Sequence, residues 1–237
     1  MINIKNITKQ FGNKLVLDDI TFDIKDNIVL GLVGLNGIGK TTLIKTILDM
    51  LTPSSGTITI NGVDNKNYKS RKSIFFLPEK FTPSAYLKGF EFLEISMSFL
   101  KKSFDFEKAQ YYAKKLDLDM NVLTNTIGSY SKGMGQKLGL LSAFLSEASI
   151  LILDEPMSGL DPKSRIMLKQ VIKEYMQEES RCIFFSSHIL ADVDELCQEI
   201  AILHDTKIKY LGGTEEFKNQ QGIENLEKAF LRCISAE

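Results

Sequence analysis

The alternation of apolar and polar residues predicts β-structure in the first quarter of the chain. Ile20, Phe22 and Ile24 alternate with polar residues, which is the period-two pattern of a strand with one buried face. Residues 28–33 form an apolar run of the kind found in strands that are buried on both faces. Residues 57–60 predict a further strand, because the turn-forming pair Asn61-Gly62 follows them.

Apolar residues recur at helical spacing after a glycine-rich segment at residues 34–39. They lie three or four positions apart from Leu43 to Leu51, so we expect a helix there. The predicted order is therefore a buried strand, a glycine turn and a helix.

Residues 80–147 differ from their surroundings because their pattern is helical throughout. We expect three helices there, one opening at Pro83 and the others over residues 107–116 and 133–145. Beyond this block, strands and helices alternate, which predicts a parallel sheet with helices on its faces. The expected strands are residues 150–153, 182–185 and 200–203, and the expected helices are residues 162–176 and 189–196, with short amphipathic helices over 214–232.

Composition narrows the function classes without naming one. Lys plus Arg is 29 and Asp plus Glu is 30 among 237 residues, so the net charge of −1 argues against a broad nucleic-acid-binding face. The chain has three cysteines, an odd and sparse number that does not suit a disulfide framework. It has no apolar stretch of 18 residues, so we expect no membrane span.

The glycine turn carries a complete phosphate-loop motif, G-x-x-x-x-G-K-[ST]. The glycines allow successive backbone N–H groups to face an anion, and the positive end of the following helix dipole adds to the attraction. Lys40 is placed to neutralise phosphate charge, and the Thr41 hydroxyl is placed to bind Mg²⁺. The alternative is a plain glycine turn that caps a helix. The candidate nucleotide-binding residues are Gly34, Asn36, Gly37, Ile38, Gly39, Lys40, Thr41 and Thr42.

A second half of a nucleotide site is expected where the apolar strand at residues 150–153 ends in Asp154 and Glu155. Ligands of open α/β sheets lie beyond the carboxyl ends of the strands. Asp154 is suited to hold Mg²⁺, and Glu155 is suited to orient or deprotonate an attacking water. Pro156 disfavours helix at Glu155, so we expect an extended backbone there. The alternative is a solvated acidic turn.

A second candidate anion site lies at Ser131 and Gly133, at the start of the third helix of the block. The Ser131 hydroxyl and the Gly133 N–H would meet an anion at the helix N-terminus. The alternative is that Ser131 is only the N-cap of this helix.

Together these residues resemble the ATP-binding subunits of ABC transporters over nearly the whole chain. Residues 130–134 resemble the family signature LSGGQ, residues 158–161 match the D-loop, and Ser187-His188 match the switch histidine. Phe11 stands where the family has an aromatic residue that stacks on adenine, and Glu79 where it has the Q-loop glutamine. Phe11 as a core aromatic, and His188 as a structural histidine, are the alternatives.

The chain also departs from the family pattern at charged positions. Glu79 replaces a glutamine, which adds negative charge beside the γ-phosphate, and Lys132 and Met134 replace a glycine and a glutamine of the signature. Ser131 and Gly133 remain. Such variants are similar to the single-cassette branch that serves antibiotic and multidrug export permeases.

The resemblance implies an α/β fold, the P-loop NTPase ABC cassette, with a mainly parallel core sheet, an N-terminal antiparallel β subdomain and an inserted helical subdomain. It implies one ATPase domain over residues 1–237. Within it, residues 1–79 and 148–237 would form the nucleotide-binding core, and residues 80–147 the helical signature subdomain.

The resemblance also implies roles for the site residues. Glu155, His188 and Lys40 would be catalytic; Thr41, Glu79 and Asp154 would hold Mg²⁺; Phe11 would bind the adenine of ATP. Ser131 and Gly133 would cap the γ-phosphate bound to a second subunit, and Asp161 would act across that interface.

The implied partners are a second ATPase subunit, identical or closely related, and a transmembrane permease, with no direct nucleic-acid binding. The expected location is the cytoplasm, peripheral on the inner face of the membrane. Two alternatives stay open: a soluble ABC ATPase that acts on nucleic acid or ribosomes, and a phosphate-loop kinase or GTPase. The chain lacks the paired cassettes or long coiled coils of the former, and a suitably placed N-K-x-D element of the latter.

Overall fold

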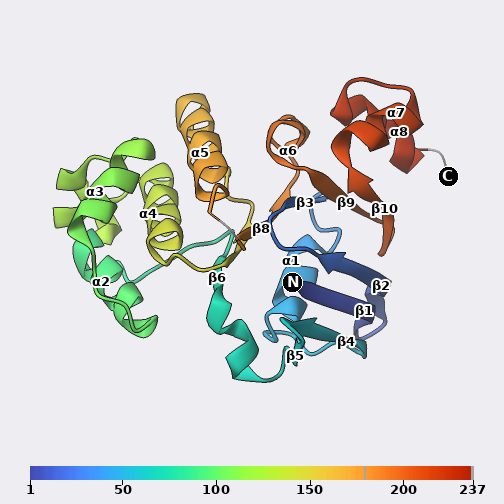
Figure 1. Ribbon diagram of the computed structural model, residues 1–237, viewed down its shortest axis with the longest axis horizontal. Coiled ribbons are helices and arrows are strands. Elements are labelled where there is room, and N and C mark those ends of the chain that lie inside the picture. Colours follow the sequence, from blue (N-terminus) through green and yellow to red (C-terminus); the bar gives the residue numbers. More distant parts are fainter. Residues whose placement is uncertain (179, 236–237) are drawn as a thin grey trace.

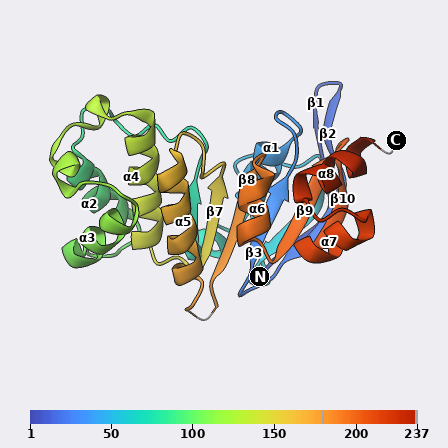
Figure 2. The ribbon, with the colours of Figure 1, turned by 90° about the horizontal axis from the view of Figure 1, so that it is seen from above.

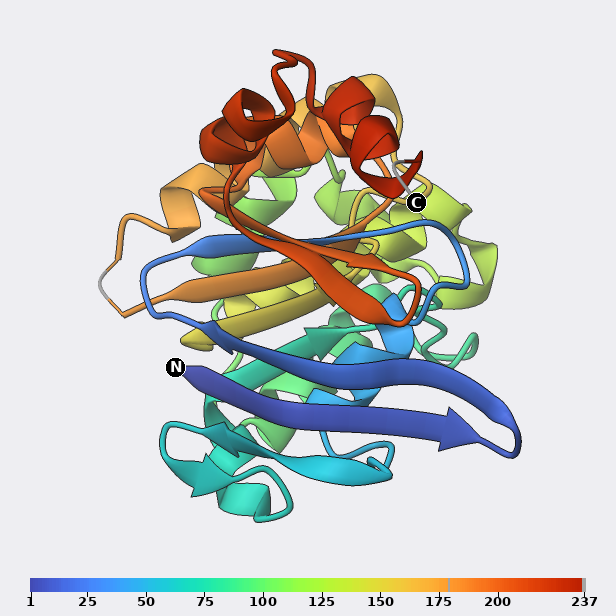
Figure 3. The ribbon, with the colours of Figure 1, turned by 90° about the vertical axis from the view of Figure 1, so that its right-hand side faces the viewer.

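Two β-sheets organise the protein in the computed structural model, which describes residues 1–178 and 180–235 (Figure 1). The smaller sheet is antiparallel, with the strand order β2-β1-β4-β5. Figure 3 shows its long β1–β2 hairpin with β4 beside it. Its strands are β1 (Ile2–Phe11), β2 (Lys14–Ile24), β4 (Ser55–Ile60) and β5 (Val63–Asp64).

The larger sheet has six strands in the order β10-β9-β3-β8-β7-β6. Neighbours are parallel except for the edge pair β9 and β10. The carboxyl ends of β3, β6, β7 and β8 therefore meet at one edge, where the candidate site lies. The strands are β3 (Val29–Val33), β6 (Ile74–Leu77), β7 (Ile150–Asp154), β8 (Cys182–Ser187), β9 (Glu199–His204) and β10 (Lys207–Gly213).

The central strand β7 shows why the buried strands are apolar without interruption. Leu151 and Leu153 belong to a hydrophobic cluster that includes the helices following β6. Ile150 and Ile152 belong to a second cluster, which contains the helix after β3 and the inner face of the antiparallel sheet. Successive side chains point to opposite faces, and since both faces are covered, every position is apolar.

Two groups of helices lie at opposite ends of the molecule. Figures 1 and 2 both show α2, α3 and α4 at one end of the molecule and α7 and α8 at the other. The helices are α1 (Lys40–Ile47), α2 (Gly89–Phe99), α3 (Phe106–Lys115), α4 (Lys132–Leu145), α5 (Pro162–Tyr175), α6 (Leu190–Leu196), α7 (Thr214–Gln221) and α8 (Leu226–Ser235). Short 3₁₀ turns are η1 (Tyr68–Ser73), η2 (Met120–Thr124) and η3 (Ile127–Ser129).

The α/β fold class, with its mainly parallel sheet and separate antiparallel sheet, is confirmed. The turn Asn61-Gly62 is also confirmed, because both residues have positive φ (51° and 77°), as a tight hairpin requires. The division of the chain into core and helical subdomain stays a prediction, although α2, α3 and α4 all lie between β6 and β7 along the chain.

The helix expected to open at Pro83 starts later, at Gly89. The Glu91 side chain accepts the Lys88 N–H at 2.8 Å, which defines the start, so the apolar spacing that begins at Leu87 extends beyond the helix. Helix α1 likewise ends at Ile47, before Leu51. The strands β1, β5, β6 and β10 were not predicted individually.

Within residues 1–178 and 180–235, no helix combines the length and the apolar character needed to cross a membrane. Cys182 and Cys197 are thiols buried inside the fold.

Candidate functional site

The loop between β3 and α1 has a backbone that only glycine accommodates. Gly37 and Gly39 have φ values of 76° and 121°, a range that other residues rarely adopt. A Cβ atom on Gly34 would lie 2.6 Å from the Leu203 carbonyl oxygen. The loop thus passes directly over the sheet and delivers the N-terminus of α1, whose first N–H groups have no partner within the helix.

Lys40, the first residue of α1, folds its side chain back over this loop. Its Nζ donates to the Gly34 carbonyl at 2.8 Å and to the Leu35 carbonyl at 3.3 Å. It also lies 3.3 Å from Glu155 Oε1, and both side chains are buried. The ammonium group is therefore held at the floor of the site and shared between neutral carbonyls and one carboxylate.

Thr41 and Asp154 meet across the ends of α1 and β7. The Thr41 hydroxyl donates to Asp154 Oδ2 at 2.8 Å, and the Ser186 hydroxyl donates to Asp154 Oδ1 at 2.5 Å. Asp154 is almost completely buried, so these two hydroxyls hold its carboxylate in one orientation.

These oxygens suit a hard divalent cation. Mg²⁺ binds proteins through one or two oxygen groups and takes its other ligands from substrate phosphates and water. Thr41 Oγ1 and Asp154 Oδ2, held together at the edge of the phosphate loop, provide such a pair. Within the part of the chain that the structure describes, no three His, Cys, Asp or Glu residues gather to enclose a metal.

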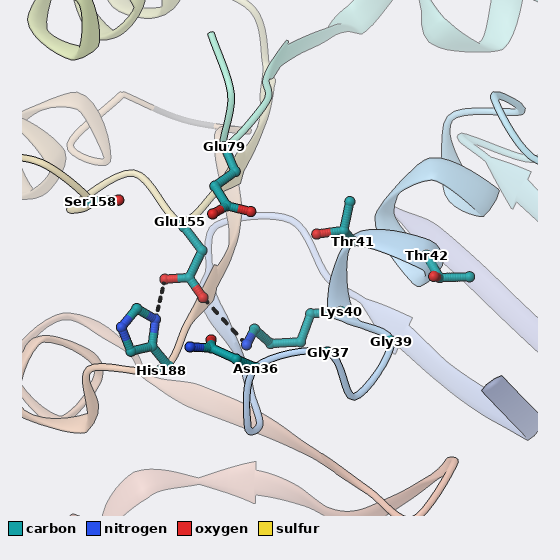
Figure 4. A pocket seen from close by; sticks show the side chains of 10 residues that line it. All are labelled: Asn36, Gly37, Gly39, Lys40, Thr41, Thr42, Glu79, Glu155, Ser158 and His188. Atoms are coloured by element: carbon teal, nitrogen blue, oxygen red, sulfur yellow. Dashed lines mark hydrogen bonds and ion pairs between the residues drawn. The ribbon is translucent and has the colours of Figure 1, made fainter. Parts of the chain in front are cut away.

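Glu155 is placed between Lys40 and His188 (Figure 4). Its Oε2 accepts a hydrogen bond from His188 Nδ1 at 2.8 Å, which places a proton on that nitrogen. Its Oε1 lies near Lys40 but accepts no hydrogen bond from the residues described. A carboxylate oxygen with free acceptor capacity, in a residue that lines a cavity, is suited to receive a proton from a water molecule.

The expectation of an extended backbone at Glu155 is wrong. Its φ is 50°, in the left-handed region, and its N–H donates to Ser186 Oγ at 2.9 Å. Pro156 does exclude the right-handed helix, but the chain turns left rather than continuing the strand. Non-glycine residues in this conformation are strained and concentrate at functional sites. The turn directs the carboxylate to Lys40 and His188.

A cavity of about 420 Å³ lies above the phosphate loop, a volume in the range of small-molecule sites. Several predicted residues line it together, and Figure 4 shows their side chains around it. Its lining consists of Asn36, Gly37, Gly39, Lys40, Thr41, Thr42, Glu79, Glu155, Ser158 and His188. Gly34, Ile38 and Asp154 are not in this lining, although each contacts a residue of the loop or site.

Ser131, Gly133 and Asp161 do not line this cavity but surround another one of about 280 Å³, and Ser131 also lines a third cavity that reaches Glu79. Ser131 is the N-cap of α4, since its hydroxyl accepts the Met134 N–H at 3.2 Å. Asp161 caps α5 in the same way, and its hydrogen bonds from the Ser164 hydroxyl and N–H lower its pKa to about 2. The predicted γ-phosphate cap and the phosphate cavity are thus separate within one chain.

Phe11 stands at the end of β1 and is 45% exposed, so its interpretation as a core aromatic is wrong. Lys9 Nζ lies 4.7 Å from the centre of its ring. Phe11 does not line the phosphate cavity. The hairpin that carries Phe11 nevertheless approaches the phosphate loop, since a Cβ on Gly39 would lie 3.0 Å from Val16.

Two serines that the sequence did not single out as site residues contact the site, although Ser158 stands in the predicted D-loop. Ser158 lines the phosphate cavity, and the fully buried Ser186 joins Asp154 to Glu155. The run Ser186-Ser187-His188, polar residues at the end of an apolar strand, was the available signal.

Replacing Ser186 by alanine should destabilise the protein and misplace both acidic residues. The change leaves Asp154 Oδ1 and the Glu155 N–H without a partner in a buried region, which typically costs about 1–3 kcal/mol. Denaturant unfolding measures this cost. Ser142→Ala is the matched control, because Ser142 is equally buried and its hydroxyl has no partner among the described residues. Equal free energies of unfolding for the two variants would contradict the assignment.

Comparison with known proteins identifies one family for this chain. Residues 17–158 match the family described as ABC transporter. An uncharacterized ABC transporter ATP-binding protein of Bacillus subtilis, YdbJ, is 33% identical over 229 residues, which cover 94% of this chain and 74% of that protein.

Solved structures agree in fold. A structure of an ATP-binding subunit of an ABC transporter has a TM-score of 0.88 at 27% identity, and the match covers 98% of this chain and 99% of that one. A dimeric ATP-binding cassette in a post-hydrolysis state, bound to ADP and Pi, has a TM-score of 0.80 at 21% identity, with coverages of 90% and 98%.

Proposed function

This chain belongs to the ABC transporter ATP-binding family, and we propose that it binds and hydrolyses ATP to drive a separate membrane permease, in the direction of export. The observation that carries the proposal is the division of its site. The cavity over the phosphate loop holds groups for binding and hydrolysis, while Ser131, Gly133 and Asp161 surround another cavity. A single chain thus carries these two sets of residues around different cavities.

The two halves become one site when two subunits meet. In the proposed dimer, Ser131 and Gly133 of one subunit cap the γ-phosphate held by the phosphate loop of the other. A two-fold arrangement would complete both sites at once, because each subunit offers one half to the other. The dimeric cassette with ADP and Pi, which shares this fold, supports such an assembly.

Within the cavity, each proposed role follows from position. Lys40 binds the β- and γ-phosphates, Thr42 and the loop glycines contact phosphate oxygens, and Thr41 with Asp154 holds Mg²⁺, with Glu79 nearby. When bound, Mg²⁺ neutralises phosphate charge. The exposed ring of Phe11 is available to stack on adenine.

Glu155 and His188 are proposed to act on the reacting groups. Glu155 receives a proton from the attacking water through Oε1, which lies beside Lys40 but accepts no hydrogen bond from the described residues. His188 holds the other carboxylate oxygen at 2.8 Å and is positioned to stabilise charge on the γ-phosphate. The triphosphate also competes for Lys40, which releases Glu155 from its ion pair.

The permease is proposed to dock on the helical block beside Glu79. A cavity of about 570 Å³ lies between residues 79–85 and the start of α4, with a mainly apolar lining. Tyr86, 92% exposed, stands next to this segment. Export is proposed from the resemblance of residues 130–134 to the exporter branch.

Affinity purification of the tagged chain from detergent-solubilised membranes of its own cells should recover a protein with several membrane spans. Tyr86→Ser should lower this recovery about tenfold, because buried aromatic anchors dominate interface energies. Mass spectrometry of the eluate measures it.

The matched control is Tyr68→Ser, which removes another exposed tyrosine from η1, outside the helical block. It should leave recovery unchanged. Recovery of ribosomal proteins or RNA in place of a membrane protein would contradict the transport proposal.

A further inference from the structure

The phosphate cavity carries more negative than positive charge. Glu79 and Glu155 line it, and Asp154 adjoins it through Thr41. Among the described residues, Lys40 is the only lysine or arginine in the lining, and it is already paired with Glu155. Glu79 forms no ion pair with any described residue, and Figure 4 shows its carboxylate directed to the cavity. A triphosphate would add further negative charge beside Glu79.

An unpaired cation, Lys132, stands at the start of α4. Within the described part of the chain it has no carboxylate partner. Its Nζ lies 3.4 Å from Ser158 Oγ, and its methylene groups pack over Gly159, where a Cβ would meet them at 3.1–3.2 Å. Because Ser158 also lines the phosphate cavity, this contact places the solvent-exposed ammonium group of Lys132 near the rim of that cavity.

We infer that Lys132 of one subunit is the counter-charge of Glu79 in the opposing subunit, and that it binds the γ-phosphate side of the closed nucleotide site. The inference rests on the proposed function. Lys132 lies between Ser131 and Gly133, the proposed γ-phosphate contacts, and successive Cα atoms are only about 3.8 Å apart. In the proposed dimer, the backbone of Lys132 therefore lies next to the same phosphate, in a cavity that Glu79 of the opposing subunit also lines.

The Lys132 side chain is already partly ordered before the dimer forms. Packing of its stem over Gly159 restricts the side chain in the separate subunit, so less conformational entropy is lost when the dimer closes. Closure then brings one cation to two anionic groups, the γ-phosphate and Glu79. The interaction is electrostatic, so it weakens with salt.

A double-mutant cycle in the Glu155→Gln background tests the pairing. Lys132→Met keeps the packed stem and removes the charge, and Glu79→Gln removes the carboxylate. ATP-dependent dimerisation is measured by sedimentation for the Glu155→Gln protein and for the three combinations of these changes. We expect Lys132→Met to weaken association about tenfold when Glu79 is present, and less than about twofold when the Glu79→Gln change is also made. Lys132→Arg keeps the positive charge, so it should associate as tightly as the Glu155→Gln protein that retains Lys132.

Three results would overturn the inference. The first is an equal effect of Lys132→Met in both backgrounds, with dimerisation otherwise intact. The second is an effect of the same size for the control Lys88→Met, since Lys88 lines neither cavity. The third is a loss of MgATP affinity in dilute, monomeric Lys132→Met protein. That loss would place the effect within one chain, where Glu79 and Lys132 also share a cavity. If the Glu155→Gln protein shows no ATP-dependent dimer at all, the proposed function fails, and the inference fails with it.

Discussion

Glu155→Gln is expected to bind ATP, to lose turnover by about 10²–10⁴-fold and to accumulate as a dimer. Glutamine has the same shape and keeps an oxygen toward His188, but it cannot accept the proton of the attacking water. Since ATP would then persist between two subunits, the contacts that hold them would persist too. Steady-state phosphate release and size-exclusion chromatography with MgATP measure the two effects.

The control for this change is Glu94→Gln, which neutralises an exposed carboxylate on α2. It should turn over at the unmodified rate. Hydrolysis by Glu155→Gln protein at that same rate would remove Glu155 from its role as base, and a monomer at saturating MgATP would argue against the shared site.

Lys40→Ala should reduce ATP affinity by at least about a hundredfold, because it removes the cation from the floor of the cavity. The change also has a structural effect. Lys40 donates to Gly34, and it offsets the buried charge of Glu155. An unpaired buried carboxylate is costly, so some loss of stability is expected as well. Equilibrium binding of ATP, together with thermal unfolding, separates the two effects.

Two further variants distinguish a loss of ATP binding from a loss of stability in Lys40→Ala. Lys40→Gln retains a donor for the Gly34 carbonyl and should fold better than Lys40→Ala while binding ATP equally poorly. Lys45→Ala, in the last turn of α1, should bind normally. Unchanged ATP affinity in folded Lys40→Ala protein would contradict the phosphate-loop assignment.

The parts of the fold that local patterns determine were predictable. The apolar run at residues 150–153 needs both faces of a sheet covered, and β7 has them covered. The phosphate loop was also predictable, because its backbone requires glycine at set positions and therefore leaves a motif in the sequence. Gly37 and Gly39 adopt backbone angles that other residues avoid. The strand–loop–helix order around them is what the motif requires.

Other features depend on contacts between distant segments and were not predictable. Pro156 removes one backbone region at Glu155, but the left turn depends on Ser186, 31 positions away, which accepts the Glu155 N–H. The start of α2 depends on close packing as well as on spacing, because a Cβ on Gly89 would lie 2.3 Å from the Tyr130 hydroxyl. The separation of Ser131 from the phosphate cavity likewise needs the tertiary structure.

The insertion of α2, α3 and α4 between β6 and β7 has a consequence for biogenesis. These strands are hydrogen-bonded neighbours, yet β6 leaves the ribosome well before β7 is made. During synthesis, β6 has no partner strand until β7 is made, and such unpaired strand edges invite aggregation. Pairing of non-local segments is slow, so nascent chains of this protein should depend on chaperones until β7 emerges.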